Sequence, residues 1–92
     1  MTERFDLPAM VNHENVQAIL EQGLSVLSKL SDGDRFSVDC SNLTHFDSSA
    51  LSLVMGLVRE AQKKSATVTL EKFPEKLASL AQVYGVAELV VA

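Results

Sequence analysis

The sequence has few of the residues from which reactive sites are usually built. It contains one cysteine, Cys40, two histidines, His13 and His45, and no tryptophan. A single cysteine excludes an internal disulfide and fits a reducing compartment. Metal sites need clustered cysteine, histidine or carboxylate ligands, and one cysteine with two separated histidines does not provide them. We therefore expect neither a metal nor a cofactor.

Long apolar runs and blocks of positive charge are also missing. No run approaches the roughly 20 apolar residues that span a bilayer, and residues 1–6 do not resemble the start of a signal peptide. The net charge of −4 argues against a nucleic-acid or anionic-membrane surface. The four glycines form no phosphate loop. These absences predict a cytoplasmic protein that neither binds nucleic acid nor inserts into a membrane.

Hydrophobic residues make up 47% of the 92 residues, which is enough for the core of one small domain spanning residues 1–92. Strand and helix patterns alternate along the chain, and their order implies an α/β fold with a largely parallel sheet. The expected elements are an edge strand within 3–9, a helix over 13–30 capped by Asn12, a strand over 35–41, a helix over 48–64, a strand over 67–71, a helix from Pro74 to Gly85, and an apolar tail, 89–92, that forms a last strand or covers an edge.

The turn before the second helix reads Asp47-Ser48-Ser49. Ser48 is a natural N-cap, and Asp47 adds negative charge near the positive end of the helix. Capping alone explains both residues. The same geometry also suits a functional hydroxyl, because a phosphoryl group on Ser48 would bring about −1.5 to −2 charges to a helix N-terminus and disturb a partner docked there.

One face of the second helix suggests a partner-docking surface. Its apolar arc should pack on the sheet, while the opposite arc combines small residues with Leu53, which core packing does not require. An ordinary solvated face with one stray leucine is the simpler interpretation. Under the docking interpretation Leu53 is an anchor. The candidate partner-binding residues are Asp47, Ser48, Ser49, Ser52, Leu53 and Gly56.

Catalysis has little support. A triad of Ser48, His45 and Asp47 would need side chains of near neighbours to converge, and no Gly-x-Ser-x-Gly elbow is present. Cys40, at a strand position, suits a small core residue better than a reactive thiol. The sequence therefore predicts a protein that is not an enzyme.

The segment from Val38 to Leu51 resembles the STAS domain family, which includes the anti-sigma-factor antagonists. The resemblance rests on a strand with an aspartate, followed by an apolar-Asp-Ser-Ser turn, and it covers roughly residues 3–90. It implies a small, mixed, largely parallel sheet flanked by helices. The phosphorylatable position of regulatory members maps onto Ser48. Ala50 departs from the usual glycine, and the short N-terminus leaves room for one strand where many members have two.

Two further segments, 61–70 and 77–86, resemble the MlaB-like STAS subunit of the Mla-type phospholipid ABC transporter. This resemblance implies an accessory subunit that binds the ATPase, with the position of Ser48 at the contact. The alternative is an anti-sigma-factor antagonist regulated by phosphorylation of Ser48, whose partners would be an anti-sigma factor and a serine kinase.

Overall fold

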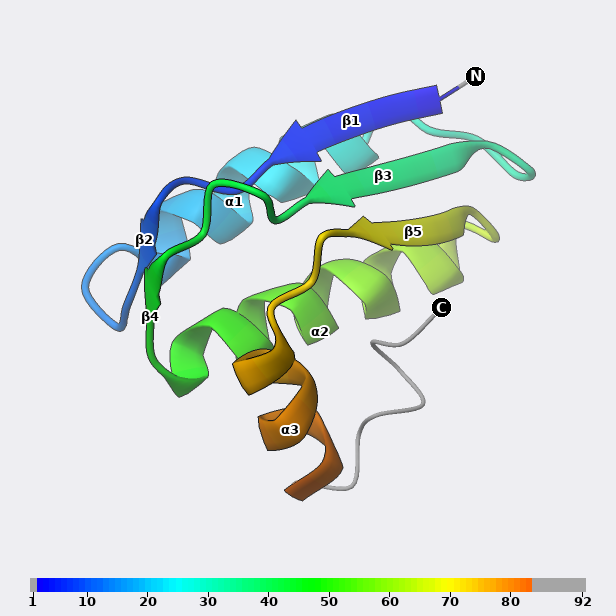
Figure 1. Ribbon diagram of the computed structural model, residues 1–92. Helices are drawn as coiled ribbons and strands as arrows, with labels where there is room; N and C mark the ends of the chain where they lie inside the picture. The colour runs from blue at the N-terminus through cyan, green and yellow to red at the C-terminus, as the bar shows by residue number, and fades with distance from the viewer. Residues whose placement is uncertain (1, 84–92) are drawn as a thin grey trace.

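The computed structural model describes residues 2–83, and its main sheet has three parallel strands (Figure 1). The central strand β3 (Arg35–Asp39) pairs with β1 (Thr2–Asp6) on one side and β5 (Thr67–Glu71) on the other. Phe36 and Val38 point to the buried face of β3 and are fully buried. The predicted α/β fold with a parallel sheet is confirmed.

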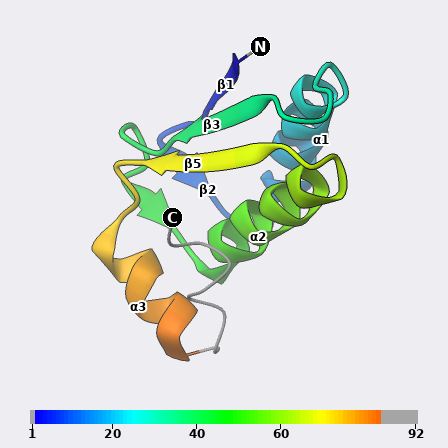
Figure 2. The same ribbon diagram turned by 90° about the vertical axis from the view of Figure 1, so that its right-hand side faces the viewer.

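Two helices cover the apolar face of this sheet. Helices α1 (Val16–Leu27) and α2 (Ser48–Lys63) lie side by side beneath the strands, and α3 (Glu75–Val83) follows β5 and packs against α2 (Figures 1 and 2). The opposite face of the sheet is polar and mostly exposed, because alternate residues of each strand point there. Its side chains are Thr2, Arg4, Asp6, Arg35, Ser37, Asp39, Thr67, Thr69 and Glu71.

Helices α1 and α2 approach each other closely at Gly23. A Cβ atom built on Gly23 would lie 2.6 Å from Leu57 Cδ2 and 3.2 Å from Phe5 Cε2. Gly23 therefore has a packing reason that outweighs its low helix propensity. Leu57 is completely buried at this crossing, and Phe5 of β1 lies beside it against Gly23.

The first helix begins later than the sequence predicts, at Val16. The Asn12 side chain accepts hydrogen bonds from the backbone N–H groups of Glu14, at 2.9 Å, and Asn15, at 3.1 Å. Asn12 thus stabilises a turn before the helix, and Asn15 is the capping residue. The predicted helix end at Gly85 and the tail 89–92 lie outside the described residues.

A short parallel ribbon, which the sequence did not predict, leads into α2. Its strands are β2 (Met10–Val11) and β4 (His45–Phe46). They follow β1 and β3 in the chain and lie at the end of the molecule where α2 begins (Figure 1). Two-residue strands are too short to show an alternating pattern, so pairing between distant segments alone defines them.

Candidate functional site

Helix α2 is capped by Asp47 and not, as predicted, by Ser48. The backbone of Asp47 is extended, and its Oδ1 accepts a hydrogen bond of 2.8 Å from the N–H of Ser49. Ser48 is therefore the first helical residue, and it is exposed. Its hydroxyl makes no hydrogen bond to any residue within 2–83. The fold uses the carboxylate as the cap and leaves the Ser48 hydroxyl available.

The charge on Asp47 is well stabilised. The bond from the Ser49 N–H lowers the pKa of Asp47 below its ordinary value, and His13 lowers it further. The His13 Nδ1 lies 3.7 Å from Asp47 Oδ2. A carboxylate at a helix N-terminus also interacts favourably with the helix dipole. The first turn of α2 therefore already holds one negative charge beside the Ser48 hydroxyl.

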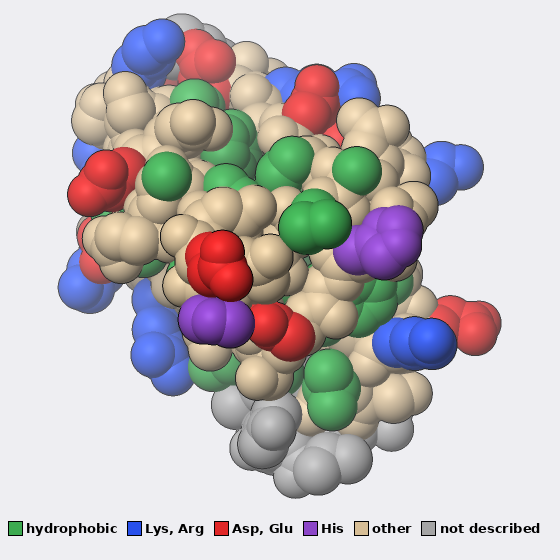
Figure 3. Space-filling model, turned by 90° about the vertical axis from the view of Figure 1, so that its left-hand side faces the viewer, with side chains coloured by type: hydrophobic (Ala, Val, Ile, Leu, Met, Phe, Trp, Pro, Cys, Tyr) green, Lys and Arg blue, Asp and Glu red, His purple; other side chains and the backbone are tan. Residues whose placement is uncertain are grey.

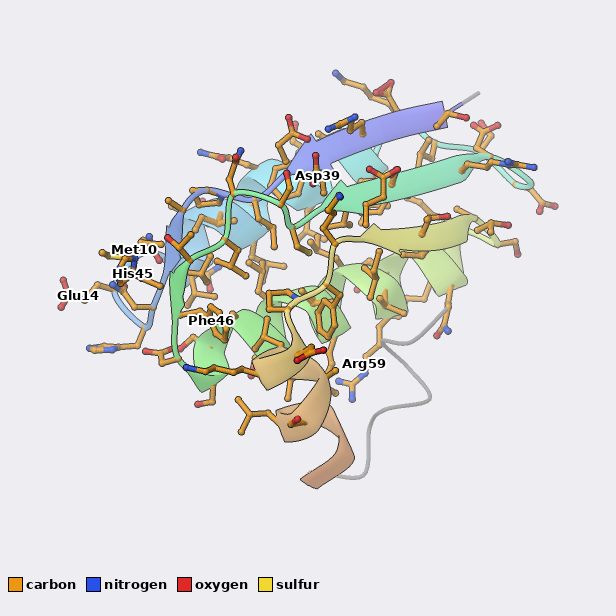
Figure 4. The ribbon with its side chains drawn as sticks, viewed as in Figure 1. Met10, Glu14, Asp39, His45, Phe46 and Arg59 are labelled. Carbon is orange, nitrogen blue, oxygen red and sulfur yellow. The ribbon has the colours of Figure 1, made fainter. Side chains whose placement is uncertain are left out.

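The ribbon β2–β4 presents two different sides next to this helix start. Met10 pairs with His45, and Val11 pairs with Phe46. Met10 and His45 point outward from the ribbon, while Phe46 points to the side of α2 (Figure 4). Figure 3 shows the outer face, on which both histidines and several separate apolar side chains are visible.

A first hollow at this end of the molecule has a volume of about 280 Å³. It lies along the ribbon and reaches the cap residue of α2. Met10, at its edge, is 49% exposed. The lining residues are Met10, Val11, Asn12, His45, Phe46 and Asp47.

The expectation that Leu53 is exposed is wrong, because this side chain is only 1% exposed. Gly56 and Leu57, one turn further along α2, both lie against α1: a Cβ on Gly56 would be 3.6 Å from Leu20 Cδ1. Leu53 shares that side of the helix, since residues three and four apart are neighbours on a helix surface. The apolar arc of α2 predicts packing on the sheet alone, whereas α1 covers a second side of this helix.

The other candidate residues differ in exposure. Asp47, Ser48 and Ser52 are exposed, and Ser49 and Gly56 are half-buried. The surface available around the start of α2 is therefore smaller than the predicted docking face of this helix. It lies closer to the capping residue Asp47 and to the ribbon β2–β4.

A second hollow, of about 390 Å³, lies between β4 and α3. It is lined by Phe46, Lys76, Ser79 and Leu80. The sequence did not predict this hollow, because Leu80 has the helical spacing of a core-facing residue of the third helix. Leu80 is in fact half-buried, whereas Leu77 of the same helix is completely buried.

The polar side chains near Ser48 do not form a catalytic arrangement. The Asp47 carboxylate is directed at the Ser49 N–H and His13, while His45 Nδ1 lies 3.0 Å from Thr44 Oγ1. Within residues 2–83, no three histidine, cysteine or carboxylate side chains are grouped as metal ligands would be.

Cys40 is a buried core residue, as the sequence predicts. Its side chain is 1% exposed, and burial raises the pKa of its thiol to about 11. At neutral pH the group is therefore a protonated thiol, and only the thiolate is strongly nucleophilic.

Comparison with protein families identifies the chain by nearly its whole length. A family model described as "Mlab, STAS domain" matches residues 6–91, which is nearly the whole chain. No curated protein matches it. Of the helices within residues 2–83, none has the length and apolar character needed to span a membrane.

Proposed function

The chain belongs to the STAS domain family, and from this premise we propose that it is a non-enzymatic accessory subunit that binds the ATPase of a Mla-type phospholipid ABC transporter. The description of the matching family model, "Mlab, STAS domain", is compatible with this role, and the match itself supports a STAS-domain protein. The resemblance of segments 61–70 and 77–86 to the MlaB-like subunit points the same way. The protein acts, on this proposal, by docking in the cytoplasm and not by chemistry.

The observation that carries the proposal is the exposed hydroxyl of Ser48. Asp47 caps α2, so Ser48 has no structural task in the first turn. Exposed residues at the start of a rigid helix are well placed to contact a partner, because the helix fixes their direction. Asp47, Ser48 and Ser52 form the centre of the proposed contact, with Ser49 and Gly56 at its edge.

Replacing Ser48→Glu tests this contact. A negative charge at the first helical position interacts favourably with the helix dipole, so the variant should keep the native fold. Within an interface the same charge must be desolvated beside Asp47, which should weaken binding about tenfold or more. The measurement is a calorimetric titration against the purified ATPase subunit, with circular dichroism to check the fold.

Ser25→Glu is the matched control, because Ser25 is an exposed residue of α1 at a different part of the surface. This variant should bind like the native protein. Equal affinity of the Ser48→Glu and native proteins would remove Ser48 from the contact. Failure of the native protein to bind the ATPase at all would overturn the proposed function.

The unused hydroxyl of Ser48 also favours a second candidate, an anti-sigma-factor antagonist that is regulated by phosphorylation of Ser48. Incubation with a cognate serine kinase and mass spectrometry would distinguish the two functions. A phosphate on Ser48 supports the antagonist, and an unmodified Ser48 supports the transporter subunit. Neighbouring genes give an independent indication: lipid-transporter subunits in one case, a kinase and a sigma factor in the other.

A further inference from the structure

The second hollow, between β4 and α3, forms a groove with apolar side chains at its base and a charged side chain at its edge. Phe46 and Leu80 are half-buried and pack against the core, while Lys76 and Ser79 are exposed. Its volume of about 390 Å³ is near the lower end of the roughly 300–1,000 Å³ that is typical of ligand sites. The two apolar side chains can therefore receive a large apolar group from another molecule.

Among the described residues that line this groove, Lys76 is the only charged one. Its ammonium makes no ion pair or hydrogen bond with the side chains described within residues 2–83. An acidic group that enters beside the apolar side chains at the base would meet this unpaired cation. Charge complementarity of this kind supplies specificity and speeds association.

The groove is continuous with the surface around Ser48. Phe46 is separated from Ser48 only by Asp47, and it lines both hollows at this end of the molecule. Within the described residues, β4 pairs with β2 alone, and its Phe46 is the residue that β4 contributes to the groove. A protein that covers Ser48 therefore lies beside the groove as well.

Resting on the proposed function, we propose that this groove receives a segment of the ATPase in which an acidic side chain stands beside a large apolar one. The apolar side chain packs on Phe46 and Leu80, and the acidic one pairs with Lys76. A protein segment fits better than a free lipid, because ligand sites for small molecules bury most of the ligand, whereas Lys76 and Ser79 of this groove are exposed to solvent.

Charge reversal at Lys76 is the main test. Lys76 lies in the first turn of α3, where a glutamate is favourable, so Lys76→Glu should keep the fold. We expect it to weaken binding of the purified ATPase about tenfold or more, since it places two negative charges opposite each other. Lys76→Arg should retain binding. Lys29→Glu, a charge reversal at an exposed position beyond the end of α1, is the matched control and should bind normally.

A second pair of variants tests occupancy of the groove without altering charge. Ser79→Tyr fills the groove from its exposed rim and should weaken binding, whereas Ser25→Tyr on α1 should not. Normal binding by both Lys76→Glu and Ser79→Tyr would overturn the groove proposal and leave the docking function standing. Normal binding by Lys76→Glu alone would overturn the acidic contact. If the native protein does not bind the ATPase, both proposals fail.

Discussion

Asp47 and Ser48 are adjacent but have separate tasks. The carboxylate of Asp47 accepts the free N–H of Ser49, while Ser48 contributes only its backbone to the helix. Loss of the cap would therefore weaken the fold, and a change of the Ser48 hydroxyl would act on the surface. This separation is what makes Ser48 a clean position for testing a partner contact.

Leu53 belongs to the core, so its replacement should affect stability and not docking. Leu53→Ala removes a side chain that is 1% exposed, and burial of this kind predicts a loss of about 2–5 kcal/mol in the free energy of unfolding. Urea unfolding measures the change. Ser52→Ala, at an exposed neighbouring position, should shift stability by less than about 0.5 kcal/mol. A Leu53→Ala protein of native stability would contradict the observed packing.

At the scale of elements, the crossing of α1 and α2 determines which side of α2 remains available. Leu57 lies against Gly23, and Leu20 lies against Gly56, so each helix contributes a glycine to the contact. The two sites differ in tightness, because the space at Gly23 is already filled by Leu57 and the space at Gly56 is not.

This difference predicts opposite effects of two alanine substitutions. At Gly23 a Cβ would lie 2.6 Å from the buried Leu57 Cδ2. Gly23→Ala should therefore lower the free energy of unfolding, because the cost of overpacking, about 1–3 kcal/mol, should exceed the gain in helix propensity. At Gly56 the nearest atom would be 3.6 Å away, so Gly56→Ala should stabilise by up to about 1 kcal/mol. Thermal and urea unfolding of both variants provide the measurement. Equal stabilisation by the two would contradict the close crossing.

Across the whole molecule, three aspartate side chains stabilise the turns between elements by hydrogen bonds to the backbone. Asp34, Asp39 and Asp47 accept backbone N–H groups of Ser31, Ser41 and Ser49, each at 2.8 Å. These bonds are the largest cause of the lowered pKa of each carboxyl group. For Asp39, Arg4 from the neighbouring strand adds an ion pair that lowers its pKa further.

The lowered pKa values predict loss of stability in acid. A carboxyl group whose pKa is lower in the folded state stabilises the fold when the pH is above the ordinary aspartate pKa of about 3.9. That stabilisation disappears as the pH falls through the folded-state pKa. The free energy of unfolding should therefore change little near neutral pH. It should decrease once the pH is lowered below about 4. Urea unfolding at a series of pH values measures the slope.

Asp39→Asn should reduce stability at neutral pH and flatten the decline in acid, because one titrating group has been removed. Glu21→Gln is a suitable control, since the Glu21 side chain makes no ion pair or hydrogen bond with those of residues 2–83. An unchanged acid slope in Asp39→Asn would show that Asp39 does not contribute to it.

The candidate site could be predicted only in part. The turn at Asp47-Ser48-Ser49 and the helix after it are visible in the sequence, because capping depends on residues two or three apart. The choice of Asp47 over Ser48 as the cap depends on backbone angles that both residue types can adopt. Lys76 and Phe46 are 30 positions apart, and no local pattern could indicate that they line one groove.

The sequence by itself determined the three strands of the main sheet, the three helices and the start of α2 at an exposed serine turn. These features follow from alternation, helical spacing and capping, all of which act within a few residues. The tertiary structure alone decided that Leu53 is buried, that Met10 and His45 share a ribbon, and that a groove opens beside Phe46. Those outcomes depend on how helices and distant segments pack against one another, and local spacing along the chain carries no information about such contacts.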